Sequence, residues 1–236
     1  MAERLPVVLI PGLQSDGRSW QFQIRHLTEA GWEVIVPTGH HNAPSIAAMA
    51  EIVLPQVPEP SHIIAWSMGG YIACQILERW PERVASLAMV ATSAQPENSA
   101  RTAERERAIA AAEADGMAAG HRANLSNSCH DVDALDPALI AELSKMAEDI
   151  GLDAFRSQQA AIIARPDARP VLAAWGGPLM ILVGEEDRVT PPELSHEMHA
   201  LVPSSRLVLV PNAGHCAPFE RPDAVNAALT EWLGGH

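Results

Sequence analysis

Short apolar runs recur along the chain, and each stops at a proline, a glycine or a polar segment. The runs cover residues 5–10, 32–36, 61–65, 84–91, 179–183 and 207–210. Strands that are buried on both faces of a parallel sheet show such continuous apolar runs, whereas half-exposed strands alternate. The pattern therefore predicts about six parallel strands, with no preceding N-terminal hairpin because only four residues come before the first run.

Segments with helical periodicity separate these runs. They cover about 20–30, 45–54, 68–80, 192–201 and 222–233. In the first segment Phe22, Ile24 and Leu27 have helical spacing and Gly31 ends the pattern, while Ser45 is placed to cap the second. Strands that alternate with helices predict an α/β fold with a mostly parallel, doubly wound sheet.

Residues 96–175 break this alternation, because no strand is evident there. Residues 99–119 are rich in Ala, Glu and Arg, which favour helices, and Asp136-Pro137 has the composition of a helix start. A further helix is expected at about 153–164. We therefore expect a core of residues 1–95 and 176–236, interrupted by an all-helical insertion.

Composition narrows the range of partners. The chain has 16 Lys and Arg against 29 Asp and Glu, a net charge of −13. Nucleic acids and anionic membranes both attract clustered positive charge, so neither is expected as a partner. No apolar run is long enough for a transmembrane helix, and no signal-peptide pattern precedes the first strand. Three cysteines without close pairing fit a reducing compartment, so we expect a cytoplasmic protein of undetermined oligomeric state.

The most informative stretch is Ala-Trp-Ser-Met-Gly-Gly at residues 65–70, between an apolar run and a helical segment. A sharp turn from strand to helix would hold Ser67 at its tip, with the hydroxyl exposed beside the positive end of the helix. Small residues are needed there because the strand and helix backbones nearly touch. An ordinary strand-to-helix turn is the alternative reading of this stretch.

This turn resembles the nucleophile elbow of α/β-hydrolases, with Ala65 in place of the usual first glycine. The family places its acid and then its histidine after the serine in the chain. Asp187 follows a strand in a turn that resembles the family's Gly-x-x-Asp-x-x-x-Pro pattern, whereas Glu185 and Glu186 fit a solvated loop. His215 ends Pro-Asn-Ala-Gly-His after the last strand and resembles the family's Gly-His turn. The resemblance thus implies a triad of Ser67, Asp187 and His215.

The resemblance also implies an oxyanion hole built from two backbone N–H groups. One belongs to Met68, which follows the nucleophile. By register the other belongs to Leu13, with Gln14 as the second choice, in a loop where Pro11-Gly12 replaces the family's frequent His-Gly. Trp66 and Leu13 would flank the substrate.

In this family a helical insertion after the nucleophile forms a lid, so residues 96–175 are expected to roof the active site. Apolar positions on its helices are Leu139, Ile140, Leu143, Met146, Ile162 and Ile163. Such a roof favours a small-to-medium, mostly apolar substrate. The alternative is ionic recognition by lid residues such as Arg122 or Arg156. The Pro-Thr-Gly-His-His segment after the second strand departs from the family's usual turn, which leaves the pocket shape open.

Together these features predict a serine hydrolase that cleaves a small carboxylic ester through an acyl-enzyme. Neither a metal nor an organic cofactor is implied, and the sequence has no spaced cluster of metal ligands. The Trp-Ser-Met-Gly-Gly stretch is similar to that of carrier-protein methyl esterases, which favours a methyl or short alkyl ester. A carbon–carbon bond hydrolase or enol-lactonase of aromatic catabolism would use the same triad. A non-catalytic binding protein on a hydrolase scaffold is the second alternative.

Overall fold

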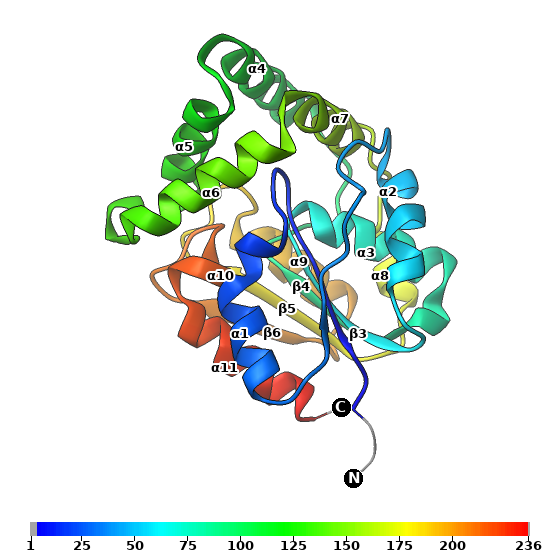
Figure 1. Ribbon diagram of the computed structural model, residues 1–236. Coiled ribbons are helices and arrows are strands. Elements are labelled where there is room, and N and C mark those ends of the chain that lie inside the picture. The colour runs from blue at the N-terminus through cyan, green and yellow to red at the C-terminus, as the bar shows by residue number, and fades with distance from the viewer. Residues whose placement is uncertain (1–3, 236) are drawn as a thin grey trace.

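A computed structural model describes residues 4–235 of the chain. In these residues six strands form one sheet in the order β2-β1-β3-β4-β5-β6, and all neighbouring strands are parallel (Figure 1). The strands are β1 (Val7–Ile10), β2 (Val34–Ile35), β3 (Ser61–Trp66), β4 (Val84–Val90), β5 (Leu179–Gly184) and β6 (Arg206–Val210). The expected parallel sheet of about six strands is confirmed.

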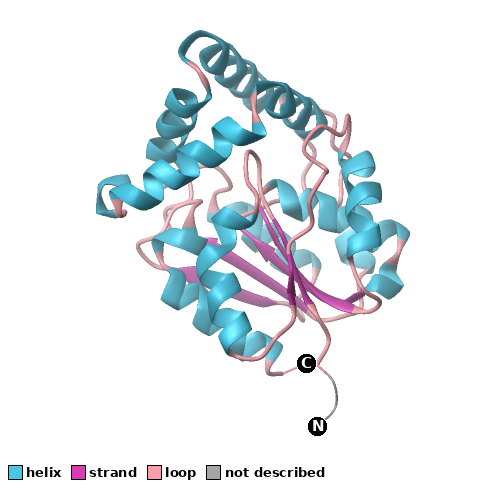
Figure 2. Ribbon diagram, viewed as in Figure 1, coloured by secondary structure: helices cyan, strands magenta, loops and turns pink. Residues whose placement is uncertain are grey.

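Helices cover both faces of the sheet (Figure 2). The helices of the sheet layers are α1 (Gln21–Glu29), α2 (Ile46–Val53), α3 (Met68–Arg79), α8 (Arg169–Ala174), α9 (Pro192–Leu201), α10 (Ala217–Glu220) and α11 (Pro222–Leu233). Short 3-10 helices cover Gly17–Trp20, Leu54–Gln56, Pro81–Arg83 and Val132–Ala134. Helices α1 and α11 pack together on one face, and α2, α3, α8 and α9 pack on the other.

The strand β1 shows why the central runs are continuously apolar. Val8 and Ile10 belong to the core under α2 and α3, whereas Val7 and Leu9 belong to the core under α1 and α11. Successive side chains of a strand point to opposite faces, so a strand covered on both sides needs apolar residues at every position.

Helical caps follow the sequence signals. The Ser45 side chain accepts a hydrogen bond from the N–H of Ala48 at the start of α2. The side chain of Asp136 does the same for the N–H of Ala138 in the helix that begins at Pro137. Both residues satisfy a backbone donor that the first helical turn leaves without a partner.

The segment between β4 and β5 consists of helices joined by loops, and none of its residues belongs to a strand. Its first four helices are α4 (Ser99–Asp115), α5 (Met117–Ser128), α6 (Pro137–Ile150) and α7 (Leu152–Ile163). They form a layer over the C-terminal ends of the strands (Figure 1), which we call the α4–α7 layer. The following α8 packs instead against α3 and α9 of the core.

The helix expected over residues 99–119 is two helices in the structure. Gly116 has a φ of +86°, a conformation that favours glycine, and it separates α4 from α5. Helix α5 then continues to Ser128, beyond the expected end. Among the described residues, no helix combines the length and the apolar character needed to cross a membrane.

Candidate active site

Ser67 lies at the tip of a sharp turn between β3 and α3. Its φ of +53° and ψ of −117° are strained for a residue with a side chain. A Cβ atom on Gly69 would collide with the carbonyl oxygen of Ile10, and one on Gly70 would collide with the side chain of Thr92. The Thr92 hydroxyl, in the loop after β4, donates to the Ser67 carbonyl oxygen at 2.7 Å and so fixes the turn. The two glycines and Thr92 therefore impose the conformation that exposes the serine.

The structure brings Ser67, His215 and Asp187 into one hydrogen-bonded chain. The Nε2 atom of His215 lies 2.9 Å from the Ser67 Oγ, and its Nδ1 lies 2.9 Å from the Asp187 Oδ2. Asp187 is 3% exposed. Its Oδ2 accepts a hydrogen bond from the Thr190 hydroxyl at 2.7 Å, and its Oδ1 accepts from the N–H groups of Val189 and Thr190, each at 2.8 Å.

These contacts decide the charge of Asp187. Burial opposes ionisation, but the charge of His215 and hydrogen bonds from His215 and Thr190 outweigh it, so the pKa of Asp187 lies below its usual value. The ionised Asp187 carboxylate accepts a hydrogen bond from the protonated Nδ1 of His215. The Nε2 atom is then left as the acceptor for the Ser67 hydroxyl.

The neighbouring acidic residues do not share this position. Glu185 is exposed. Glu186 was expected to be solvated like Glu185, but its Oε2 accepts a hydrogen bond from the N–H of Ala213 at 2.9 Å. It thus ties the loop after β5 to the loop that carries His215.

Trp66 supports the histidine from the residue before the serine. Its indole Nε1 donates to the carbonyl oxygen of His215 at 3.0 Å, and the two rings lie 5.8 Å apart between centroids. Phe219 packs edge-on against the same indole. Trp66 also lines the cavity above Ser67.

The structure places Leu13 in the loop after β1 and Met68 at the first position of α3. Within residues 4–235, neither backbone N–H donates to a backbone oxygen. The N–H of Gln14, the second choice from the sequence, instead donates to the Oε1 of Gln158 at 2.9 Å. Leu13 therefore remains the candidate donor from this loop, together with Met68.

Gln158 is a contact that the sequence reasoning missed. It is fully buried on α7 and reaches the loop after β1 from 144 residues away in the chain. Its only signal in the sequence is a polar residue in a segment expected to pack as an apolar helix face. Another contact from the same layer is the Sδ of Met146 on α6, which accepts from the N–H of Asp16 at 3.3 Å.

A cavity of about 710 Å³ opens above Ser67 and His215. Its apolar wall includes Tyr71, Leu125, Leu143, Met146 and Ile162. Three of the expected roof residues, Leu143, Met146 and Ile162, thus face it. Leu139, Ile140 and Ile163 are not among the described lining residues.

The arginines that line this cavity differ from those expected. They are Arg101 and Arg105 on α4 and Arg188 in the loop after β5. Arg122 is exposed on α5, and Arg156 pairs with Glu113 in an exposed ion pair. Neither of these two residues lines the cavity.

The loop after β2 contacts the loop that carries Leu13. The Nε2 of His41 lies 3.0 Å from the carbonyl oxygen of Ser15, and the His41 ring stacks on that of His40 at 4.5 Å. His40 is fully buried, and this burial, together with the nearby His41, lowers its pKa to about 4. The loop therefore supports the site through Ser15.

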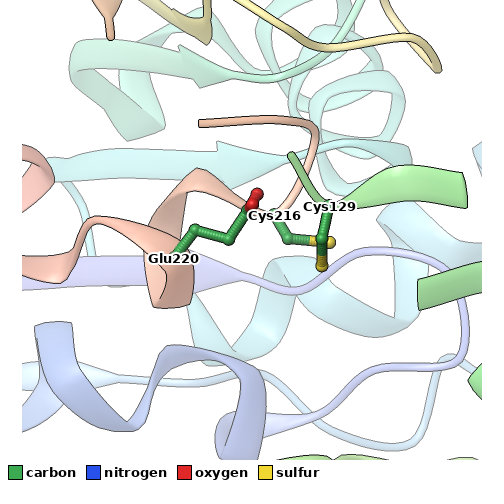
Figure 3. A group of neighbouring side chains, drawn as sticks. All are labelled: Cys129, Cys216 and Glu220. Atoms are coloured by element: carbon green, nitrogen blue, oxygen red, sulfur yellow. The ribbon is translucent and has the colours of Figure 1, made fainter. Parts of the chain in front are cut away.

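The structure groups three side chains that the sequence did not bring together: Cys129, Cys216 and Glu220 (Figure 3). Their two Sγ atoms and a carboxylate oxygen lie within 4.8 Å of one another. Burial raises the pKa of the Cys216 thiol well above its usual value, and contact with Cys129 adds to the effect. Metal binding needs thiolates. The Glu220 carboxylate already accepts from the N–H groups of His130 at 2.6 Å and Gly214 at 2.9 Å. These donors fit a hydrogen-bonded contact better than a metal centre.

The chain belongs to the alpha/beta hydrolase family, whose sequence model matches residues 7–228. It is 26% identical over 216 residues to the pimeloyl-acyl-carrier protein methyl ester esterase of Neisseria meningitidis, covering 84% of this chain and 80% of the relative. Two solved structures share its fold. An esterase from Thermogutta terrifontis has a TM-score of 0.84 at 25% identity, covering 98% of this chain and 90% of that one. The enol-lactonase from Burkholderia xenovorans LB400 has a TM-score of 0.83 at 21% identity, covering 98% and 92%. The fold and the relatives thus define a hydrolase family that includes esterases.

Proposed function

We propose that the protein is a serine hydrolase of carboxylic esters, with Ser67 as nucleophile, His215 as base and Asp187 as the acid that orients the histidine. The observation that carries the proposal is the hydrogen-bonded chain from Asp187 through His215 to Ser67, at the base of a cavity. A neutral serine is a poor nucleophile, and such a chain supplies the base that activates it.

The reaction follows from this geometry. His215 Nε2 removes the proton of Ser67 as its Oγ attacks the ester carbonyl, and the N–H groups of Leu13 and Met68 stabilise the negative charge on the carbonyl oxygen. The protonated His215 donates its proton to the leaving alcohol. His215 then removes a proton from a water molecule as the water attacks the acyl-enzyme, and it gives that proton to the Ser67 Oγ as the bond to the acyl group breaks and the acid leaves. Asp187 stabilises the charged imidazolium in both steps.

We propose a small-to-medium substrate with an apolar chain, and we assign the α4–α7 layer as the lid above it. Leu143, Met146 and Ile162 of that layer line the cavity. Methyl ester cleavage by the Neisseria relative supports an ester of a short alcohol. The likeness to an enol-lactonase keeps a lactone as a second candidate, since the same triad opens it.

We further propose a cytoplasmic location and a small-molecule partner. The three cysteines are free and buried, which fits a reducing compartment. The net charge of −13 disfavours nucleic acid and anionic lipid surfaces as partners.

Labelling with a fluorophosphonate probe tests the nucleophile. The wild-type protein should form one adduct at Ser67 and hydrolyse a simple aryl ester, and Ser67→Ala should lose both while remaining folded by circular dichroism. Ser19→Ala is the matched control, because Ser19 also lines the cavity without contacting His215. An adduct on the Ser67→Ala variant would place the nucleophile elsewhere. Absence of any adduct or turnover in the wild type would favour the binding-protein alternative.

A further inference from the structure

Helix α4 turns a charged face toward the cavity. Arg101, Glu104, Arg105 and Ala108 line it at the i, i+3, i+4 and i+7 spacing of one helix face. Arg188 joins them from the loop that follows Asp187. Among the described lining residues, three guanidinium groups thus accompany a single carboxylate, in a chain whose net charge is −13.

Contacts inside the protein do not neutralise this charge. One buried carboxylate, that of Glu97, lies between Arg105 at 2.5 Å and Arg165 at 2.9 Å, with Arg101 at 3.6 Å. Burial opposes its ionisation, but the bonds from Arg165 and Arg105 hold the pKa of Glu97 below its usual value. Glu97 and Glu104 thus supply two negative charges against the four positive charges of Arg101, Arg105, Arg165 and Arg188, so the cluster keeps a positive excess. Within residues 4–235, Arg188 has no ion pair.

Two of these guanidinium groups are held in fixed positions. The Nη1 of Arg105 donates to the Oε1 of Gln159 at 2.9 Å, and the Nη2 of Arg101 donates to the carbonyl oxygen of Val189 at 2.6 Å. The side chains of Arg101 and Arg105 are only 23% and 13% exposed. A guanidinium has five N–H donors, so both retain donors for a ligand. Preorganised and partly desolvated arginines bind a carboxylate strongly, because the fork of donors matches its two oxygens.

We infer that this cavity takes an ester whose far end carries a carboxylate, such as the half-ester of a dicarboxylic acid. The inference rests on the proposed function, because Ser67 fixes where the ester carbonyl lies. The apolar chain would lie along Leu143, Met146 and Ile162, and the carboxylate would bind at Arg101 and Arg105, with Arg188 adding to the positive potential. Hydrolysis consumes one water and releases the alcohol, the dicarboxylate and one proton.

Matched substrates test the inference. The experiment compares kcat/KM for the monomethyl and dimethyl esters of the same dicarboxylic acid over a series of chain lengths. The wild type should prefer the half-ester at least tenfold at its best length, with the difference mainly in KM. In Arg101→Gln/Arg105→Gln this ratio should fall close to one. The ratio is an internal control, because general damage to the enzyme lowers both values.

Two further variants separate the cluster from charge elsewhere. Arg122→Gln removes an exposed arginine of α5 that does not line the cavity, and it should keep the wild-type ratio. Arg188→Gln leaves the contacts of α4 intact and should lower the ratio in part, which keeps the test valid if the double variant does not fold.

Three outcomes would overturn the inference while Ser67-dependent turnover persists. They are equal use of half-ester and diester by the wild type, a preference that survives loss of the arginines, and a stronger preference for a phosphate-terminated ester of the same length. The proposed function fails by a different result, the absence of Ser67 labelling and of turnover for every ester.

Discussion

The indole N–H of Trp66 donates a hydrogen bond to the carbonyl oxygen of His215, with the two atoms 3.0 Å apart. The residue before the candidate nucleophile therefore holds the loop of the candidate base. The nucleophile turn and the histidine loop come from positions 148 residues apart, so this bond fixes their relative position independently of the Ser67–His215 contact.

Replacing Trp66 with Phe should remove this bond while keeping a ring in the cavity. One such hydrogen bond contributes about 1 kcal/mol, so we expect a loss of stability near this size and a several-fold fall in kcat. Trp20→Phe is the matched control. The Trp20 indole is buried beside Trp66, and its Nε1 has no hydrogen-bond partner within residues 4–235. Thermal unfolding and aryl ester kinetics on both variants measure the difference. Equal losses of stability and kcat in the two variants would mean that the smaller ring, and not the missing hydrogen bond, causes them.

Asp187→Asn should be far more damaging than Glu186→Gln. An amide at position 187 presents a donor where His215 needs an acceptor, and the matching change in a serine protease lowers kcat about 10⁴-fold. Glu186→Gln keeps an oxygen for the N–H of Ala213, so its kcat should fall less than about tenfold. Steady-state kinetics on the two variants decide the register of this turn. A larger loss from Glu186→Gln would transfer the acid role to Glu186.

Gln158→Met should impair the reaction without removing any group that touches the substrate. It deletes the acceptor of the Gln14 N–H and so loosens the loop that presents the Leu13 N–H. We expect kcat to fall about tenfold with little change in KM, because oxyanion contacts strengthen in the transition state. Phe155→Leu is the control for damage to α7, because Phe155 is buried on the same helix and does not line the cavity. If Gln158→Met changes KM alone, the loop does not depend on this bond.

Stability should fall between pH 7.5 and 5 because of two buried histidines. Burial lowers the pKa of His40 and of His121 from 6.5 to about 4. Below pH 6.5 the two histidines bind protons in the unfolded chain but stay neutral in the folded protein. Their contribution to the free energy of unfolding is therefore complete above pH 6.5 and is lost as the pH falls toward 4. Each residue should account for roughly 2 kcal/mol over this interval.

Urea unfolding at several pH values measures this dependence. His40→Leu should reduce the fall in the free energy of unfolding between pH 7.5 and 5 by the contribution of one histidine. His196→Leu changes an exposed residue on α9 and should leave that fall unchanged. An unchanged slope in the His40 variant would show that this residue takes up its proton in the folded state.

The sequence predicted features that depend on local pattern. β3 and β5 are buried along their whole length, so their apolar runs mark them, and the elbow, acid and histidine turns follow strands whose C-terminal ends meet at one edge. The hydrogen-bonded arrangement of Ser67, Asp187 and His215 agrees with that register, and their catalytic roles stay predictions.

The features that were missed depend on contacts between distant segments. Gln158 contributes to the site by accepting a hydrogen bond from the N–H of Gln14. Arg101 is held in place by the carbonyl oxygen of Val189, 88 residues further along the chain. The sequence alone did not reveal which arginines turn inward, because the four consecutive charged residues 104–107 place charges on every side of α4. Gly116 resembled an interior helix residue until its positive φ separated two helices.

The bond between Gln14 and Gln158 also limits how this protein can be recombined. A chimera that kept the sheet and took its α4–α7 layer from another protein would lose the acceptor that orders the loop after β1. Such a graft would change the substrate pocket and slacken the catalytic loop at once. Exchange of specificity between relatives would therefore require the layer and this loop to be transplanted together.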